Sequence, residues 1–283
     1  MDWIVPVSES ERQAGALLPA SAGKAYGAMR DAGCVLLRGV FSTEMIDAVY
    51  REFLAHYGAM DLRAMTEQAA KPLPNPFLEV GGARFEIVPR MAGAFGDPDL
   101  FASALLRRFL MPLLGSDMRL SGFTVVVSHP GATLQHIHRD HAHLYTDPSV
   151  ARSLPCYAVN VSVPLIDIDM QTGPTGVWPG SHTWPGGQVP SPETVTAIPF
   201  QRGDCILMDY RTLHTGMPNR GTRIRPILYL VYTRTWFFDE VNHAGRAALD
   251  LPMEKFLALP ETMRPLLLRA FAQAMRAKHL TQP

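Results

Sequence analysis

RIRPILYLVYTRTWFF, residues 223–238, is a run of β-branched, aliphatic and aromatic side chains. It is the last of five such stretches, which are separated from one another by glycine- and proline-containing turns. The other four are MRLSGFTVVVSHPG (118–131), TLQHIHRDHAHLY (133–145), CYAVNVSVPLIDI (156–168) and TAIPFQRGDCILMDY (196–210). Short strands at this spacing, with no helical pattern between them, predict a β-sandwich or β-barrel.

Segments with helical periodicity flank these strands. SAGKAYGAMRDAG ends at Gly33, and STEMIDAVYREFLAHYGAM begins at Ser42 or Thr43, either of which can cap a helix. PDLFASALLRRFLMPLLG and the C-terminal segment are also predicted helices. We therefore expect one domain over residues 1–283, with a helical part at about 1–68, a β core at about 84–238 and C-terminal helices at about 243–280.

Composition indicates a globular protein with a small-molecule partner. The 283 residues carry 26 basic and 26 acidic side chains, and 47% of them are hydrophobic. No basic run is interleaved with aromatic residues, so we expect no nucleic-acid partner. No apolar run is long enough to span a bilayer, and the start lacks a signal-peptide pattern, so we expect no membrane association. Three widely spaced cysteines without a CxxC pair favour a reducing compartment, and we expect a cytoplasmic protein.

Four of the ten histidines lie in QHIHRDHAHLY, residues 135–145. Side chains two residues apart on a strand share a face, so His136, His138 and Asp140 are predicted to point the same way. A His-x-Asp pair supplies two of the three ligands of the 2-His-1-carboxylate facial triad, which suits non-haem Fe(II). The alternative, a His-x-His pair followed closely by a glutamate, is disfavoured because no glutamate follows.

A distant histidine and two arginines follow in DYRTLHTGMPNRGTRIRPILYLVY. His214 is the candidate for the third metal ligand. A facial triad leaves positions open for a bidentate 2-oxo acid and O2, and the far carboxylate of that acid needs a cation. Arginine suits this role because its planar guanidinium binds a carboxylate through two hydrogen bonds. Arg223 and Arg225 are two residues apart, so strand geometry alone does not choose between them.

Together these segments resemble the phytanoyl-CoA dioxygenase family of Fe(II)/2-oxoglutarate oxygenases. The resemblance covers most of the chain and is strongest from about Arg84 to Phe238. It is carried by QHIHRD, TGPTGVWPGSH, GDCILMDYRTLHTG and NRGTRIRPILYLVY, which occur in the family's order. The second motif is most similar to that of members that tailor secondary metabolites in bacteria and fungi. The resemblance implies a mainly β fold, a double-stranded β-helix (jelly roll) with flanking α-helices.

The resemblance also implies roles for individual residues. In the family, asparagine lies five residues after the distal histidine, and arginine followed by proline lies eleven after it. Here these positions are Asn219 and Arg225, with Pro226 next, so the resemblance selects Arg225 over Arg223. The implied iron ligands are His138, Asp140 and His214. The implied contacts of 2-oxoglutarate are Arg225, Gln135 and Thr175.

Four further residues are predicted to lie around the ligands or to line the substrate pocket: His136, Asn160, Arg84 and Trp236. Each has a plainer alternative. His136 can be a packed histidine, and Asn160 can lie on a solvated strand face. Arg84 alternates with Glu86 in RFEIVPR, as in any half-exposed strand. Trp236 can belong to ordinary aromatic packing.

The implied activity is that of a dioxygenase that uses Fe(II), 2-oxoglutarate and O2. It would hydroxylate, or otherwise oxidise at a C–H bond, a small-molecule substrate, and would release succinate and CO2. Asp140 separates this chain from halogenases of related fold, which have a small residue in place of the carboxylate. Two alternatives stay open: a zinc-dependent hydrolase on the same ligand set, and a catalytically inactive jelly-roll binding protein. No residue pattern selects one substrate or an oligomeric state.

Overall fold

The computed structural model describes residues 2–73, 75–242 and 247–281, and its strands form two sheets. The larger sheet has eight strands in the order β1-β2-β9-β6-β11-β5-β4-β3, and the smaller has three in the order β10-β7-β8. The strands of the larger sheet are β1 (Ile4–Pro6), β2 (Cys34–Arg38), β3 (Phe77–Glu79), β4 (Arg84–Ile87), β5 (Arg119–Ser128), β6 (Ala158–Pro164), β9 (Cys205–Asp209) and β11 (Arg225–Thr233). Those of the smaller sheet are β7 (Thr175–Val177), β8 (Thr196–Ala197) and β10 (His214–Gly216).

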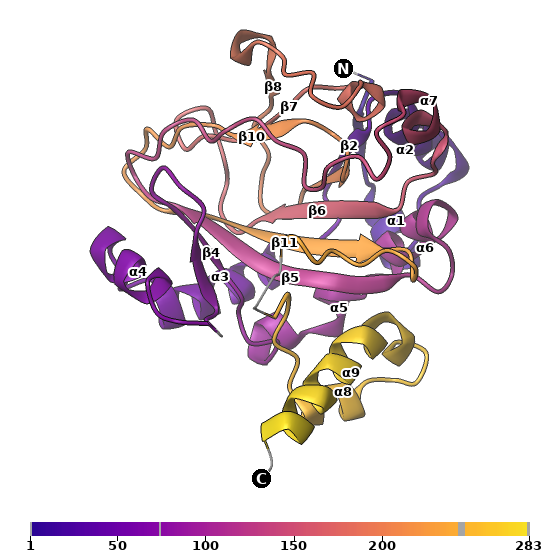
Figure 1. The fold of residues 1–283 in the computed structure, drawn as a ribbon. Coiled ribbons are helices and arrows are strands. Elements are labelled where there is room, and N and C mark those ends of the chain that lie inside the picture. The colour runs from indigo at the N-terminus through magenta and orange to yellow at the C-terminus, as the bar shows by residue number, and fades with distance from the viewer. Residues whose placement is uncertain (1, 74, 243–246, 282–283) are drawn as a thin grey trace.

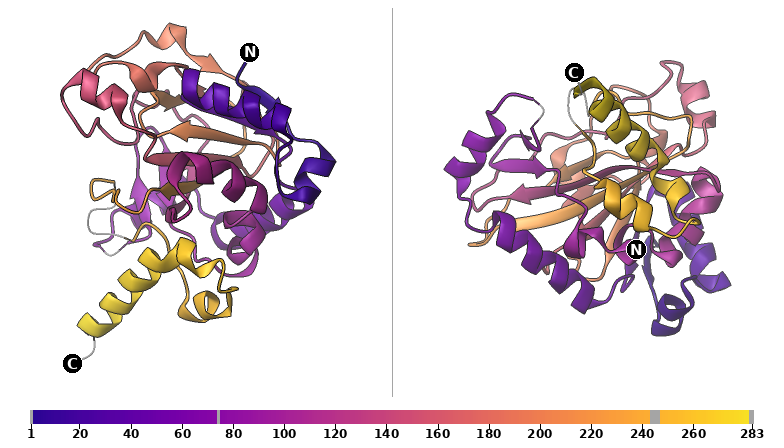
Figure 2. Two further views of the ribbon diagram at one scale, coloured as in Figure 1. Left: turned by 90° about the vertical axis from the view of Figure 1, so that its right-hand side faces the viewer. Right: turned by 90° about the horizontal axis from the view of Figure 1, so that it is seen from below.

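Helices cover one face of the larger sheet, and the smaller sheet lies across its other face (Figure 1). The helices are α1 (Glu9–Ala14), α2 (Pro19–Asp31), α3 (Thr43–Tyr57), α4 (Leu62–Ala69), α5 (Pro98–Phe101), α6 (Ala104–Leu114), α7 (Pro148–Ser153), α8 (Met253–Ala258) and α9 (Arg264–Thr281). Short 3-10 turns occupy Gly93–Gly96, Ser181–Thr183 and Pro192–Thr194. Views from the side and from below show α8 and α9 projecting on the helical side of the sheet, where α9 contacts β5 (Figure 2).

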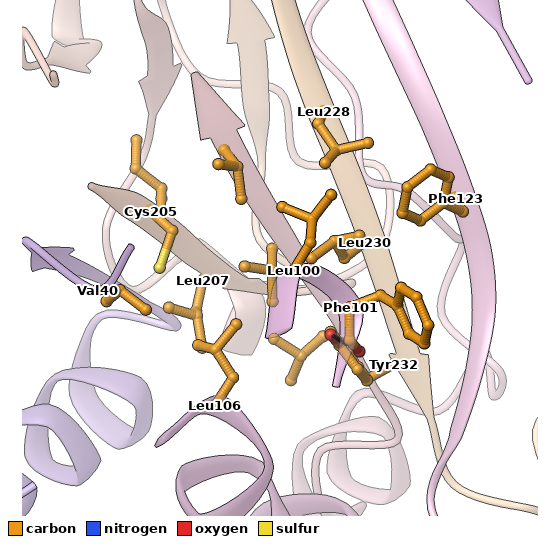
Figure 3. Packing of buried hydrophobic residues seen from close by; sticks show 14 of the residues in the cluster. Val40, Leu100, Phe101, Leu106, Phe123, Cys205, Leu207, Leu228, Leu230 and Tyr232 are labelled. Carbon is orange, nitrogen blue, oxygen red and sulfur yellow. Dashed lines mark hydrogen bonds between the residues drawn. The ribbon is translucent and has the colours of Figure 1, made fainter. Parts of the chain in front are cut away.

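Successive side chains of β11 point alternately to the helices and to the pocket. Leu228, Leu230 and Tyr232 are buried among side chains from α5 and α6 (Figure 3), and the Tyr232 hydroxyl donates a hydrogen bond to the Phe101 carbonyl. The other side chains of β11, every second one from Arg225 onward, face the space between the two sheets. The buried strand pattern therefore supplies both the core and the lining of a pocket.

Two facing sheets with flanking helices confirm the predicted jelly-roll class. Ser42 caps α3 by accepting a hydrogen bond from the Met45 N–H, as the sequence indicated. The helix predicted over PDLFASALLRRFLMPLLG is broken into α5 and α6, because Ala102 and Ser103 have non-helical backbone angles. The N-terminal part also contributes strands β1 and β2 to the main sheet. The predicted beginning of the C-terminal helices, 243–246, lies outside the described residues.

The prediction of a strand at 133–145 is wrong. Only His138 forms a bridge there, with His214 of β10. The reason is that β10 is three residues long, so the segment has no partner for a longer ladder. The Gln135 N–H still donates to the Gly216 carbonyl, so the main chain runs beside β10 up to His138. Among the described residues, no helix has the length and apolarity required to cross a membrane.

Candidate metal centre and co-substrate pocket

His138, Asp140 and His214 come together at the end of the smaller sheet. One donor atom from each lies within 4.8 Å of the other two. The main chains of His138 and His214 exchange two hydrogen bonds, of 3.1 and 2.9 Å, and this pairing holds their rings 4.3 Å apart between centroids. Asp140 Oδ1 lies 3.5 Å from His214 Nε2. Two residues on one extended segment and one on the neighbouring strand thus form a cluster of two imidazoles and a carboxylate.

Both imidazoles are fixed in the same tautomer. His138 Nδ1 lies 2.9 Å from the carbonyl of His136, and His214 Nδ1 lies 3.1 Å from the carbonyl of Thr212. A carbonyl only accepts, so each Nδ1 carries a proton, and in the neutral form of each ring Nε2 is the nitrogen with the free lone pair. Such an outer hydrogen bond is the usual support of a metal-binding histidine.

Burial keeps His138 neutral. Together with the neighbouring His214 ring, it lowers the pKa of His138 to about 3. The lone pair of the ring is therefore available across the physiological pH range, as a metal requires of its ligands. The donor set fits a cation that takes two imidazole nitrogens and one carboxylate oxygen, with open positions left for other ligands, which is typical of non-haem Fe(II).

Asp140 is held from two sides. Asn160 Nδ2 donates to Asp140 Oδ2 at 3.0 Å, and Asn242 Nδ2 donates to the Asp140 carbonyl at 2.6 Å. Asn242 follows β11 in the chain and also contacts Asp239 Oδ2 at 2.7 Å. Sequence reasoning selected Asn160 as a neighbour of the site but missed Asn242, for which no motif exists.

Two buried guanidinium groups lie on the same row of the larger sheet. Arg84 on β4 and Arg225 on β11 are both paired with Ser128 of the intervening strand β5, and their exposed fractions are 0% and 1%. Arg84 Nη2 donates to the carbonyls of Gly216 and Met217, at 3.2 and 2.9 Å. Arg84 therefore lies behind the site and does not line the pocket beside it.

Neither guanidinium is neutralised within the described residues. No carboxylate there forms an ion pair with either one, and Arg84 Nε, Arg84 Nη1 and Arg225 Nε have no hydrogen-bond partner among them. Burial and the charge of Arg225 lower the pKa of Arg84 to about 10. Burial likewise lowers the pKa of Arg225. A buried cation with unused donors is costly unless an anion joins it, so this row is suited to binding a carboxylate.

Gln135 and Thr175 complete the wall beside the arginines. The Gly216 N–H donates to Gln135 Oε1 at 3.2 Å, which leaves the Gln135 amide N–H groups for another acceptor. Thr175 of β7 is paired with Gly216 of β10. A Cβ on Gly216 would lie 3.0 Å from Gln135 Oε1 and 3.1 Å from Arg84 Nε, so the absence of a side chain there allows both groups to approach.

A pocket of about 490 Å³ joins the metal cluster to Arg225. Its lining includes all three metal-site residues, together with Arg225, Gln135, Thr175, Asn160 and His136. His136 is exposed, and its ring lies 4.7 Å from that of His138. Trp236 does not line this pocket. It is 57% exposed and lines a neighbouring hollow with Phe237 and Phe238.

Arg139, which lies between two of the metal-site residues, fastens their segment to the rest of the site. Its Nε donates to the Arg211 carbonyl at 2.8 Å, and its Nη2 donates to the Ser181 carbonyl at 3.1 Å. The Ser181 hydroxyl in turn accepts a hydrogen bond from the Leu213 N–H, directly before His214. This connection was not predicted, because main-chain carbonyls on distant segments leave no trace in the local sequence.

Comparison with known proteins agrees with this geometry. The family model described as phytanoyl-CoA dioxygenase matches residues 29–227, which is more than half of the chain. The multifunctional dioxygenase prhA of Penicillium brasilianum is 26% identical over 83% of this chain and 78% of its own length. The dioxygenase andF of Emericella variicolor is 28% identical over 43% of each chain, so the chain spans less than half of that relative in the match.

Two solved structures share the fold. The epimerase SnoN, solved in complex with Fe3+, alpha ketoglutarate and nogalamycin RO, is 19% identical, with a TM-score of 0.55 over 77% of this chain and 85% of its own. EvdMO1 is 20% identical, with a TM-score of 0.54 over 76% of this chain and 50% of its own. At this identity the similarity shows the fold, and the family assignment comes from the match over residues 29–227. The chain belongs to the phytanoyl-CoA dioxygenase family of Fe(II)/2-oxoglutarate oxygenases.

Proposed function

We propose that this protein is a non-haem Fe(II)/2-oxoglutarate-dependent dioxygenase that hydroxylates, or otherwise oxidises at a C–H bond, a small-molecule substrate. The strongest support for this proposal is the set of groups that line one pocket. A cluster of two imidazoles and one carboxylate shares a pocket with Arg225, a buried guanidinium that no described carboxylate neutralises. A cation site beside an anion site in one pocket fits a metal and a dicarboxylate co-substrate bound together.

In this proposal His138, Asp140 and His214 hold the iron, which supplies the activation of O2 when bound. Arg225 binds the distal carboxylate of 2-oxoglutarate, since it lines the pocket and its Nε has no acceptor among the described residues. Arg84 lies behind Arg225 and adds positive charge to this end of the pocket. Gln135 and Thr175 hydrogen-bond the co-substrate from the smaller sheet. The protein thereby orients the co-substrate and excludes water, and the metal performs the difficult chemical step.

The substrate that we propose is a secondary metabolite or its precursor. Support comes from relatives named as fungal dioxygenases and from SnoN, whose structure contains nogalamycin RO. We place His136 and Asn160 beside this substrate, because both line the pocket. Trp236 lines the neighbouring hollow, so it would reach only a part of the substrate that extends beyond the metal pocket.

We also propose that residues 1–283 act as one oxygenase domain. The strands β1 and β2 extend the sheet that carries Arg225, and α9 packs on β5 of the same sheet. We assign the protein to the cytoplasm, a proposal supported by its free cysteines Cys34, Cys156 and Cys205. The small-molecule substrate is the only partner that we propose.

A zinc-dependent hydrolase on the same ligands is less well supported. Such an enzyme needs an open metal position and a general base, but it gives no role to two buried guanidinium groups that have no anionic partner among the described residues. An inactive binding protein would likewise have no reason to keep the costly Arg84 and Arg225 in an apolar sheet. Both alternatives predict that 2-oxoglutarate is not consumed.

Turnover of 2-oxoglutarate tests the proposal. Purified protein with Fe(II), O2 and 2-oxoglutarate should form succinate, at a low rate without substrate, whereas Zn(II) should support none. His214→Ala should abolish succinate formation. His141→Ala is the matched control, because His141 lies in the same segment but packs its ring 5.2 Å from Phe237, away from the metal site. Absence of succinate from the wild-type protein, combined with Zn(II)-dependent hydrolysis, would contradict the assignment.

A further inference from the structure

Asn160 is an unusual residue for its position in the sheet. It lies in β6, whose seven residues AVNVSVP are all buried, and its immediate neighbours are valines. Its exposed fraction is 5%, and it is paired with Val231 of β11 on the pocket-facing side. A buried amide costs free energy unless its polar atoms are hydrogen-bonded. Valine would be the expected residue if this position served packing alone.

Only one half of the Asn160 amide finds a partner. Its Nδ2 donates to Asp140 Oδ2 at 3.0 Å. Its Oδ1 is buried and has no hydrogen-bond partner among the described residues. The orientation of the amide is fixed chemically, because an ionised carboxylate only accepts and must therefore meet the NH2 group. Stability alone does not explain a buried amide with one unsatisfied oxygen.

The hydrogen bond from Asn160 gives the two carboxylate oxygens of Asp140 different surroundings. Oδ2 is occupied by Asn160, whereas Oδ1 lies on the side of His214, 3.5 Å from its Nε2. The main-chain carbonyl of Asp140 is held separately by Asn242. Asp140 is thus restrained at both its side chain and its backbone, with Oδ1 directed to the metal cluster.

We infer that Asn160 is a positioning residue that keeps Asp140 a one-oxygen ligand. This inference rests on the proposed function. A metal held by three protein atoms has positions left for the two oxygens of 2-oxoglutarate and for O2. A carboxylate can also bind a metal through both of its oxygens. If Asp140 did so, it would take a position that the co-substrate needs, and the hydrogen bond from Asn160 prevents this.

The test compares Asn160→Val with Ser162→Ala in the full-length protein. Valine matches the neighbours of Asn160 and removes its amide, both the Nδ2 donor to Asp140 and the Oδ1 that has no partner among the described residues. Ser162 is the matched control, because it is a buried polar residue on the same side of β6 and has no hydrogen bond to Asp140 among the described residues. The probe is Co(II), whose visible absorption weakens as its coordination number rises. Each Co(II)-loaded variant is then titrated with 2-oxoglutarate.

We expect Asn160→Val to weaken 2-oxoglutarate binding by about 10- to 100-fold, the usual effect of losing an outer hydrogen bond at a metal site. Its Co(II) absorption before co-substrate is added should be weaker than that of wild type. Ser162→Ala should match wild type in both measurements. If circular dichroism shows that Asn160→Val does not fold, Asn160→Ala, which removes the same donor without branching, takes its place under the same criteria.

Two results would overturn the inference. The first is an Asn160→Val protein that binds 2-oxoglutarate as tightly as wild type with an unchanged Co(II) spectrum. The second is an equal loss in Ser162→Ala, which would make the effect a general one of β6. Failure of the proposed function gives a different result, because the wild-type Co(II) protein itself would then not bind 2-oxoglutarate.

Discussion

Replacement of Arg225 by methionine should weaken 2-oxoglutarate binding while leaving the stability of the fold nearly unchanged. Arg225 is 1% exposed and donates to the Gly173 carbonyl, but its Nε has no partner among the described residues. Methionine keeps an unbranched apolar side chain and removes the charge. The variant loses one hydrogen bond, worth about 1 kcal/mol, and is relieved of an unpaired buried cation next to Arg84. We therefore expect its free energy of unfolding without co-substrate to stay within about 1 kcal/mol of wild type.

The effect on 2-oxoglutarate binding should be much larger. A hydrogen bond to a charged group contributes about 1.5–3 kcal/mol, so the dissociation constant should rise by about 10- to 100-fold. At a concentration 100 times the wild-type dissociation constant, the ligand stabilises wild type by about 2.7 kcal/mol. The same concentration would stabilise Arg225→Met by only about 0.4–1.4 kcal/mol. At about 2 °C per kcal/mol for a chain of this size, the ligand-induced rise in Tm would fall from about 5 °C to about 1–3 °C.

The assay is thermal unfolding with and without 2-oxoglutarate, performed anaerobically with Fe(II). Arg223→Met is the matched control, since Arg223 is the same residue type two positions earlier, is exposed, and donates to the Asp167 carbonyl at 3.5 Å. Its ligand-induced rise in Tm should equal that of wild type. A full rise in Arg225→Met, or an equal loss in Arg223→Met, would refute the role given to Arg225.

Three further outcomes are expected. Arg84→Met should leave the free energy of unfolding without co-substrate within about 1 kcal/mol of wild type, because relief of a buried charge offsets the loss of two hydrogen bonds. It should weaken 2-oxoglutarate binding less than Arg225→Met does, because Arg84 does not line the pocket; calorimetric titration measures the binding. Gly216→Ala should weaken 2-oxoglutarate binding by about tenfold with Co(II) affinity unchanged, because its Cβ would lie 3.1 Å from Arg84 Nε. Burial raises the pKa of Glu11, but hydrogen bonds from the N–H groups of Ser8 and Leu18 outweigh it and lower the pKa to about 2. The stabilisation by the ionised carboxylate is then fully present above about pH 4.5 and is lost as the pH falls through about 2. Urea titrations should therefore show Glu11→Gln about 1 kcal/mol less stable than wild type at pH 7, with the difference decreasing as the pH falls toward 2.

Local patterns in the sequence predicted many of the elements and two of the three residues of the metal cluster. The β-branched run at 223–238 contains β11, and Ser42 caps α3 as expected. His138 and Asp140 were paired by their two-residue spacing, and they do converge although their segment is not a regular strand. The spacing argument survives because an extended main chain alternates its side chains whether or not a full ladder forms.

The position of Arg84 could not be predicted in the same way. RFEIVPR alternates like a half-exposed strand, but Arg84 is fully buried. Its burial depends on the register that aligns it with Ser128 and Arg225 across three strands. These pairings join segments that are distant in the sequence, and local periodicity contains no information about them. Trp236 shows the converse, since an aromatic residue expected near the substrate lies in a separate hollow.

The measurement that tests the central claim most directly is an anaerobic titration of metal-free protein with Fe(II) and 2-oxoglutarate. It follows the weak visible charge-transfer band of the keto acid bound to iron. The account predicts that the band appears in wild type, is absent from His214→Ala, and requires about 10- to 100-fold more co-substrate in Arg225→Met. A wild-type protein that gives no band, while Zn(II) binds tightly to the same three residues, would contradict the account.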